Sequence, residues 1–219
     1  MSESELRIQM VQFCKSLYER GYMAGGAGNV SVRVDGSTIL ATPTGSCLGR
    51  LVADELSLVD NSGMLISGKK PSKEVKFHLA LYKDPSVHAV VHLHSTWTTR
   101  LSCIADIDTN EIIKPFTPYF VMKIDMIEMI PYYPPGDDRL AEALGKWAGK
   151  RNAFLLQNHG PVITGSSLEV AMDLMEEFEE TAKLVYLLKD EKVRYLSENE
   201  IDYLRNKEKQ NNKRSQQWP

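Results

Sequence analysis

Cysteine is scarce in this sequence, and the three cysteines lie far apart. Cys14, Cys47 and Cys103 form no closely spaced pair, and their odd number leaves one thiol unpaired in any disulfide scheme. The set is therefore not the disulfide framework of a small secreted domain, and it suits a reducing compartment. We expect three small thiols that are buried or half-buried in the fold.

The sequence also lacks a long apolar run and an excess of charge of one sign. No uncharged apolar stretch approaches the roughly 18 residues of a membrane span. The first residues lack the basic segment and apolar core of a secretory signal. Lys and Arg number 26 and Asp and Glu number 29, so the net charge of −3 offers no electrostatic footprint for nucleic acid. We therefore expect a cytoplasmic protein without nucleic-acid or membrane partners.

The composition is that of one globular domain. The 219 residues fit a single core, and 42% hydrophobic with 25% charged residues argues against general disorder. Strand-like and helical patterns alternate along the chain, which indicates an α/β fold, and we predict a three-layer α/β/α domain with a central mixed sheet. The predicted elements are a helix over 6–18, a hairpin over 30–41 with its turn at Asp35-Gly36, strands at 64–66, 89–94 and 154–157, and helices at 96–103 and 138–150.

Two further helices have recognisable start signals. Ser72 is predicted to be the N-cap of a helix that runs through about Tyr82. Ser166 and Glu169 have the spacing of a capping box for a long amphipathic helix.

The C-terminal end is polar. Between Asn206 and Gln217 there is no apolar residue. We therefore predict a domain over residues 1–205 and a polar, mobile tail over residues 206–219.

Three histidines have the pattern of a metal site. His92 and His94 are two residues apart on a predicted strand, so their side chains point to the same face. His159 lies where a later strand meets a tight turn and would complete a three-ligand site with an open position for substrate. The paired histidines alone are a weak signal. His78 and His88 lack such a setting, and we interpret them as structural residues of a helix and a loop.

Small polar residues beside glycines indicate an anion site. Gly28-Asn29, Thr44-Gly45 and Ser72 could together present N–H and hydroxyl groups to a phosphate, although each segment alone is also typical of an ordinary turn. Lys73 is either a cation for this site or an exposed lysine at a helix start. Glu74 either complements the helix dipole or acts as an acid/base beside a metal.

Together these residues resemble the class II aldolase/adducin family over about residues 6–189. The motifs occur in the family's order: Gly28-Asn29-Val30-Ser31, Thr44-Gly45, Pro71-Ser72-x-Glu74, His92-Leu93-His94-Ser95 and Asn158-His159-Gly160. The resemblance implies one Zn²⁺ per subunit, held by His92, His94 and His159, with Glu74 as the acid/base. It implies that Asn29, Thr44, Gly45 and Ser72 hold the substrate phosphate. It also implies a homotetramer with active sites between subunits.

Within the family, the sequence departs from the fuculose-phosphate aldolases, which have Ser-Ser-Glu where it has Ser72-Lys73-Glu74. It looks most like the 3-oxo-tetronate 4-phosphate decarboxylases, although a Ser usually precedes the last glycine of Gly25-Gly26-Ala27-Gly28 in that group. The resemblance implies loss of CO₂ through a metal-stabilised enediolate to give dihydroxyacetone phosphate. Glu74, or Tyr119 from a neighbouring subunit, would deliver the proton, and Lys73 would orient the carboxylate or phosphate.

Other functions are consistent with parts of the pattern. The first is an aldolase that cleaves a sugar phosphate such as fuculose 1-phosphate. Epimerases of the family have Asp where Glu74 stands, and a dehydratase has little support in this sequence. A non-catalytic module is the alternative from another class, but adducin-like members lack the metal histidines, so the presence of the histidines favours an enzyme.

Overall fold

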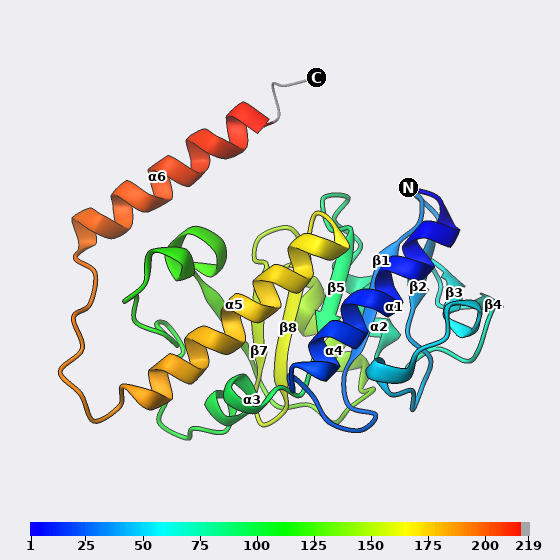
Figure 1. Cartoon of the computed structure of the whole chain (residues 1–219), viewed down its shortest axis with the longest axis horizontal. Helices are drawn as coiled ribbons and strands as arrows, with labels where there is room; N and C mark the ends of the chain where they lie inside the picture. The colour runs from blue at the N-terminus through cyan, green and yellow to red at the C-terminus, as the bar shows by residue number, and fades with distance from the viewer. Residues whose placement is uncertain (216–219) are drawn as a thin grey trace.

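The computed structural model describes residues 1–215, and side chains through residue 208. An eight-stranded sheet lies at its centre, with helices on both faces (Figure 1). The elements in chain order are α1 (Glu3–Glu19), β1 (Asn29–Arg33), β2 (Thr38–Ala41), the short 3₁₀ turns η1 (Leu48–Arg50) and η2 (Ala53–Glu55), β3 (Ser57–Asp60), β4 (Leu65–Ser67), α2 (Val75–Leu81), β5 (Ala89–His92), α3 (Thr96–Ser102), the π-helical turn η3 (Phe120–Ile124), β6 (Ile127–Ile130), α4 (Asp138–Gly145), β7 (Ala153–Leu156), β8 (Gly160–Gly165), α5 (Leu168–Leu187) and α6 (Glu198–Ser215).

The sheet is mixed, as predicted. Its strand order is β4-β3-β2-β1-β5-β8-β7-β6, and every neighbouring pair is antiparallel except β6 and β7. The predicted hairpin is confirmed as β1 and β2. In the middle of the sheet, Asn29 of β1 lies opposite His92 of β5, and His92 lies opposite Val162 of β8. Residues far apart in sequence are thereby brought side by side.

The helices form the two outer layers of the domain. Helices α1, α3 and α5 pack on one face of the sheet, and α2 and α4 pack on the other. Alternation along each strand divides the apolar side chains between these layers. In β5, for example, Val91 packs toward α1 and α5, whereas Val90 packs toward α2 and α4. The predicted three-layer α/β/α fold is confirmed.

Two helix starts differ from the predictions. Helix α2 begins at Val75, not beside Ser72, and the Ser72 hydroxyl accepts a hydrogen bond from the Glu74 N–H at 3.2 Å within the preceding turn. The side chain that caps α5 is Ser167, which accepts from the Val170 N–H, so the predicted capping box of Ser166 is wrong by one residue. At the start of α5 two adjacent serines could cap the same turn, and packing decides between them.

Two other elements are shorter than predicted. Strand β5 ends at His92, so His94 lies beyond the strand, and α4 ends at Gly145, five residues before Lys150. Gly145 lies against Ala80 of α2, where an added Cβ would be 3.4 Å from the Ala80 Cβ. This close approach leaves little room beside the last turn of α4.

The C-terminal segment is helical where the sequence predicted a polar tail. Helix α6 runs to Ser215, so residues 206–215 belong to it, and residues 216–219 lie outside the described residues. Ser197 and Glu200 make the reciprocal bonds of a capping box, and the helix contains three Glu, three Lys and two Arg, which favour helix. Local propensity therefore accounts for the helix, whereas the mobility of the tail stays a prediction.

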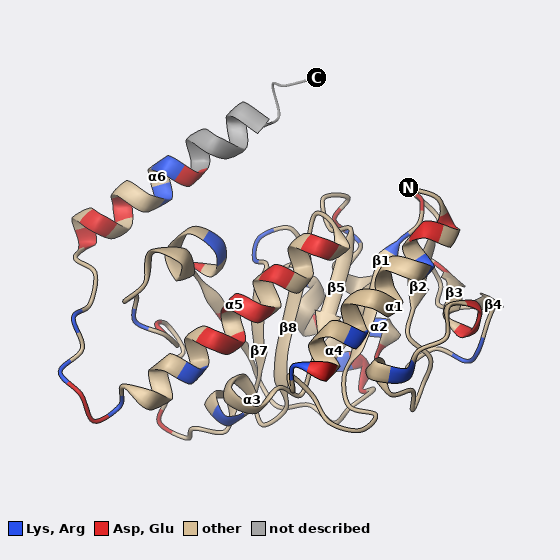
Figure 2. Cartoon of the chain, in the orientation of Figure 1, with Lys and Arg blue, Asp and Glu red and all other residues tan. Residues whose placement is uncertain are grey.

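The surface charge is uneven. Acidic residues follow the exposed side of α5 (Figure 2), and α5 contributes Glu169, Asp173 and Glu180 there. This face would repel a polyanion. Within the described part of the chain, every helix is too short or too polar to cross a bilayer.

Candidate metal centre

Three imidazoles meet at one end of the central strands. His92 ends β5, His94 follows it, and His159 lies in the turn between β7 and β8. The Nε2 atom of His94 lies 3.1 Å from that of His92 and 3.0 Å from that of His159. With Zn–N distances of about 2.0–2.1 Å, the ligand nitrogens of a tetrahedral site lie about 3.3 Å apart. The cluster that the sequence predicted is therefore assembled, and its spacing fits a divalent ion.

The backbone that carries His159 is shaped for this position. Asn158 has φ 55°, in the left-handed region that Asn tolerates better than most residues. Gly160 has φ 151°, and a Cβ added there would lie 2.5 Å from the Leu93 carbonyl oxygen. The turn thus lets the segment with His159 approach the segment with His94 more closely than a larger residue at position 160 would allow.

Hydrogen bonding and burial prepare the imidazoles to bind a metal. His92 Nδ1 donates to the Pro161 carbonyl oxygen at 2.8 Å, so the lone pair of the ring is on Nε2, inside the cluster. Burial lowers the pKa of His92 well below its ordinary value, and the neighbouring His159 and His94 lower it further. Burial also lowers the pKa of His94 and of His159. Neutral imidazole is the form that a metal ion requires.

Glu74 faces the histidine cluster from the turn before α2. Its side chain is only 10% exposed, and its Oε2 accepts from Asn29 Nδ2 at 2.6 Å. Oε2 lies 3.6 Å from His92 Nε2, and Oε1 lies 3.6 Å from His159 Nε2. Oε1 is buried and has no hydrogen-bond partner among the described residues. A buried carboxylate oxygen without a partner is costly, which indicates a site completed by a cation or a proton donor.

Two of the predicted phosphate segments lie side by side. The Thr44 N–H donates to the Lys70 carbonyl, and the Ser72 N–H donates to the Thr42 carbonyl, so the two segments are tied together. A cavity of about 350 Å³ is bordered by Gly25, Gly26, Thr44, Gly45, Ser46 and Arg50, among others. Its backbone and hydroxyl groups are of the kind that bind phosphate.

The remaining predicted phosphate residues have other surroundings. Gly28 has φ +82°, and a Cβ added there would lie 2.8 Å from the His92 carbonyl oxygen, so Gly28 serves close packing. Asn29 directs both atoms of its amide to Glu74 and His78. Lys73 is exposed beside Glu74. The predicted role of these residues in phosphate binding stays a prediction.

Tyr119 is not joined to the cluster within this chain. Its side chain is 60% exposed just before η3, and its ring centre lies 6.0 Å from Lys123 Nζ. Among the described residues, no hydrogen bond or ion pair connects it to Glu74 or to the histidines. The role of Tyr119 in the site of a neighbouring subunit stays a prediction.

Sequence reasoning missed the residue that secures the loop after His94. Glu179 of α5 is buried, and its carboxylate accepts from the N–H groups of Trp97 and Thr98 and from the Thr98 hydroxyl. The Ser95 and Thr98 hydroxyl oxygens lie 2.7 Å apart. A signal was available, because Glu179 is a charged residue on the apolar face of a long helix.

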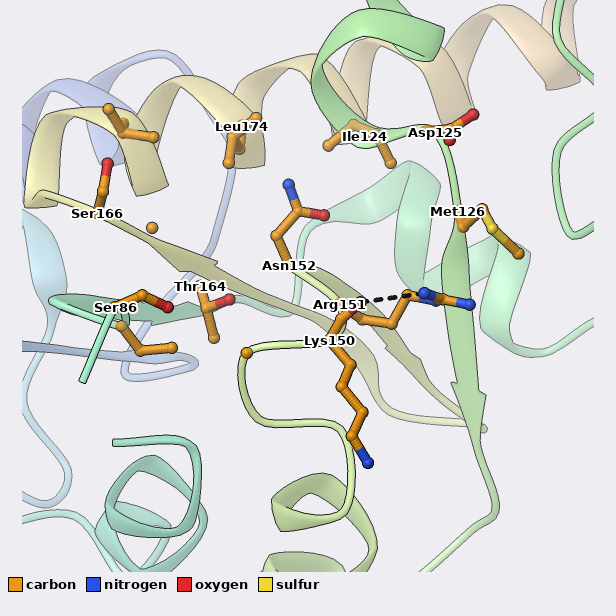
Figure 3. A pocket seen from close by; sticks show the side chains of 14 residues that line it. Ser86, Ile124, Asp125, Met126, Lys150, Arg151, Asn152, Thr164, Ser166 and Leu174 are labelled. Carbon is orange, nitrogen blue, oxygen red and sulfur yellow. Dashed lines mark hydrogen bonds between the residues drawn. The ribbon is translucent and has the colours of Figure 1, made fainter. Parts of the chain in front are cut away.

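A second cavity, of about 470 Å³, lies at the opposite end of the same strands (Figure 3). It is bordered by Ser86 before β5, by Thr164 near the end of β8, and by Lys150, Arg151 and Asn152 before β7. Because His92 stands at the other end of β5, this cavity is separate from the histidine cluster. None of the predicted site residues borders it.

Comparison with known proteins agrees with this geometry. Residues 8–186 match the family described as Class II Aldolase and Adducin N-terminal domain. A 3-oxo-tetronate 4-phosphate decarboxylase of Pectobacterium atrosepticum is 56% identical over 201 residues, which are 91% of this chain and 92% of that protein. An L-fuculose phosphate aldolase of Methanococcus maripaludis is 35% identical over 181 residues, which are 82% of this chain and 96% of that protein.

A solved structure has the same fold at high sequence identity. The crystal structure of YgbL from Klebsiella pneumoniae superposes with a TM-score of 0.91 at 52% identity, covering 94% of this chain and 100% of that one. The family match runs from α1 through nearly all of α5 and includes the three histidines and Glu74. The chain therefore belongs to the class II aldolase and adducin family.

Proposed function

We propose that this chain is a metal-dependent decarboxylase, a carbon–carbon lyase that converts 3-oxo-tetronate 4-phosphate to dihydroxyacetone phosphate and CO₂. The observation that carries the proposal is the buried Glu74 Oε1. It lies 3.6 Å from His159 Nε2 in a three-imidazole cluster and has no hydrogen-bond partner in the described part of the chain. Such a site suits an anionic substrate that first loses CO₂ and then takes up a proton. The relatives above 50% identity that bear this activity's name support the choice of substrate.

The reaction breaks the bond between the carboxylate carbon and C2 of the substrate. CO₂ leaves, and the electron pair delocalises from C2 into the neighbouring C3 carbonyl. A bound divalent metal would act as a Lewis acid and stabilise the negative charge that develops there. C2 then accepts a proton, which gives dihydroxyacetone phosphate.

The residues of this chain have separable roles in that reaction. His92, His94 and His159 would hold the metal, and we propose Zn²⁺, one per subunit, although three imidazoles also accept Mn²⁺, Co²⁺ or Fe²⁺. Glu74 would deliver the proton from Oε1, the oxygen that no described residue engages. The segments with Gly28-Asn29, Thr44-Gly45 and Ser72 would bind the phosphate, with Lys73 as a nearby cation.

We propose a homotetramer with active sites between subunits, in the cytoplasm. The exposure of Tyr119 supports this assembly, because a side chain that is 60% exposed is available to a neighbouring subunit's site as a second proton donor. The compartment is supported by three cysteines that form no disulfide in the structure. Light scattering after gel filtration would measure the oligomeric state.

The function is tested by incubating the zinc-loaded protein with 3-oxo-tetronate 4-phosphate and measuring CO₂ and dihydroxyacetone phosphate together. Equal release of both, abolished by His92→Ala and retained by His88→Ala, is the expected result; the His88 side chain is exposed away from the cluster. Aldehyde release from a ketose 1-phosphate without CO₂ would instead identify an aldolase. Inactivity of a zinc-containing protein on both substrates would contradict the proposed substrate.

A further inference from the structure

A chain of buried polar side chains runs from Glu74 along the side of α2 that faces β1. Asn29 Oδ1 lies 2.5 Å from His78 Nε2, and His78 Nδ1 lies 2.7 Å from Ser31 Oγ. Ser31 Oγ in turn lies 2.9 Å from the Tyr82 hydroxyl. All five side chains are buried, so water cannot replace a lost hydrogen bond, and each lost bond would leave a buried polar atom without a partner.

The direction of each bond follows from Glu74. Glu74 Oε2 accepts whether or not Oε1 carries a proton, so the Asn29 amide nitrogen faces Glu74 and the Asn29 oxygen faces His78. His78 Nε2 must then donate. Burial lowers the pKa of His78 to about 3, so the ring is neutral and its Nδ1 accepts from the Ser31 hydroxyl. The Tyr82 hydroxyl completes the chain by donating to Ser31.

The hydrogen bonds could also all run in the opposite direction, but that arrangement requires a protonated Glu74. If His78 carried its proton on Nδ1, the Asn29 amide nitrogen would donate to Nε2. The Asn29 oxygen would then face Glu74, and the carboxyl group would have to be protonated to avoid repulsion between two acceptors. The tautomer of His78 therefore reports which way the Asn29 amide points.

We propose that His78 is a positioning residue that, through the Asn29 amide, holds Glu74 with Oε2 engaged and Oε1 free for the substrate. The inference rests on the proposed function, because it names the oxygen that exchanges the proton. His78 is 2% exposed and bonds to Asn29 and Ser31, so it acts on the substrate through Asn29 and Glu74. Without the His78 donor, Asn29 can rotate and Glu74 loses its fixed orientation.

The kinetic test compares two replacements of His78. His78→Leu removes the donor and is expected to lower kcat by about 10- to 100-fold, the effect of a catalytic group displaced by about 1 Å. Zinc content should change less than about two-fold, because His78 is not one of the three metal ligands. KM should change less than kcat, because the segments with Thr44-Gly45 and Ser72 are left in place. His78→Gln can place an amide N–H against Asn29 Oδ1 and should recover most of kcat. His88→Gln is the control histidine.

A spectroscopic test uses the wild-type protein, so it requires neither the substrate nor a correctly folded variant. The tautomer of His78 can be read from long-range ¹H–¹⁵N NMR spectra of the wild-type protein with and without zinc. Protonation on Nε2 is expected, and protonation on Nδ1 would overturn the inference. If His78→Gln folds but is no faster than His78→Leu, His78 acts by packing alone and the inference is also wrong.

The two tests separate this inference from the proposed function. Wild-type protein that releases no CO₂ would contradict the function, while the NMR result would still report the direction of the bonds. Active wild-type protein with His78 protonated on Nδ1 would leave the function intact and remove the proposed role of His78.

Discussion

Glu179 connects helix α5 to the loop that carries His94. Its Oε1 accepts from the Trp97 N–H at 2.7 Å, and its Oε2 accepts from the Thr98 N–H at 2.9 Å and from the Thr98 hydroxyl at 2.7 Å. The two N–H groups belong to the first turn of α3, which has no partner for them within the helix. One carboxylate from a distant helix therefore replaces the local N-cap side chain.

The substitution Glu179→Gln tests this connection with little change of shape. A Gln side chain offers one acceptor oxygen, so one of the N–H groups of Trp97 and Thr98 is left facing an NH₂ group. An unsatisfied buried donor costs about 1–3 kcal/mol. Loss of the negative charge at a helix N-terminus removes about another 0.3–1 kcal/mol. We expect Glu179→Gln to lower the free energy of unfolding by about 1.3–4 kcal/mol.

The free energy of unfolding of the metal-free protein can be measured by urea denaturation, with Asp173→Asn as the matched control. Asp173 lies on the exposed side of the same helix, and its replacement should change stability by less than about 0.5 kcal/mol. Zinc affinity, measured by competition with a chelator, should also fall in Glu179→Gln because the His94 loop is less ordered. Equal stability of the two variants would refute the reasoning. Lower stability with unchanged zinc affinity would show that Glu179 secures α3 but not the loop.

Three further predictions concern the metal and the backbone around it. Removing zinc with a chelator should lower the melting temperature measured by calorimetry, because free metal at 100 times its Kd stabilises the fold by about 2.7 kcal/mol; an unchanged melting temperature would contradict a bound metal. Gly28→Ala should lower the free energy of unfolding by at least about 1–2 kcal/mol, because Gly28 has a φ of +82°. It should also lower the zinc content, because the new Cβ would lie 2.8 Å from the His92 carbonyl oxygen. Gly36→Ala is the control, because a Cβ there meets open space. Arg205→Ala removes the paired hydrogen bonds to Asp125 and should make α6 more sensitive to limited proteolysis, with a change in the unfolding free energy of less than about 1 kcal/mol; a larger loss would mean that α6 is part of the core.

The architecture could be predicted from the sequence because apolar alternation and helical spacing are local properties. The hairpin of residues 30–41 and the buried strand β5 follow from such patterns. The grouping of the three histidines could be predicted for a related reason. His92 ends β5 and His159 follows β7. Both strands are antiparallel to β8, which lies between them, so they run in the same direction and end at the same edge of the sheet.

Contacts between distant segments could not be predicted. The partners of Glu179 precede it by 81 and 82 residues, and no local pattern specifies them. The start of α5 shows the same limit on a smaller scale. Ser166 and Ser167 are both suitable caps, but a Cβ added to Gly165 would lie 2.6 Å from the Ala171 nitrogen, so packing of the helix against β8 decides the register.

The register of the central strands links the site to the fold. Asn29 lies opposite His92, and side chains two residues apart share a face, so Asn29, Ser31 and His92 all point toward α2. The start of α2 then brings Glu74 to Asn29, and one turn later it brings His78 between Asn29 and Ser31. A slip of β1 by one residue would turn both polar residues toward α1 and α5 and would leave His78 without partners in the core. Because an unpaired buried polar group is costly, the bonds that orient Glu74 also disfavour the wrong strand pairing. The hydrogen bonds among Glu74, Asn29, His78 and Ser31 therefore help to fix the register of β1, and that register in turn places Asn29 beside Glu74.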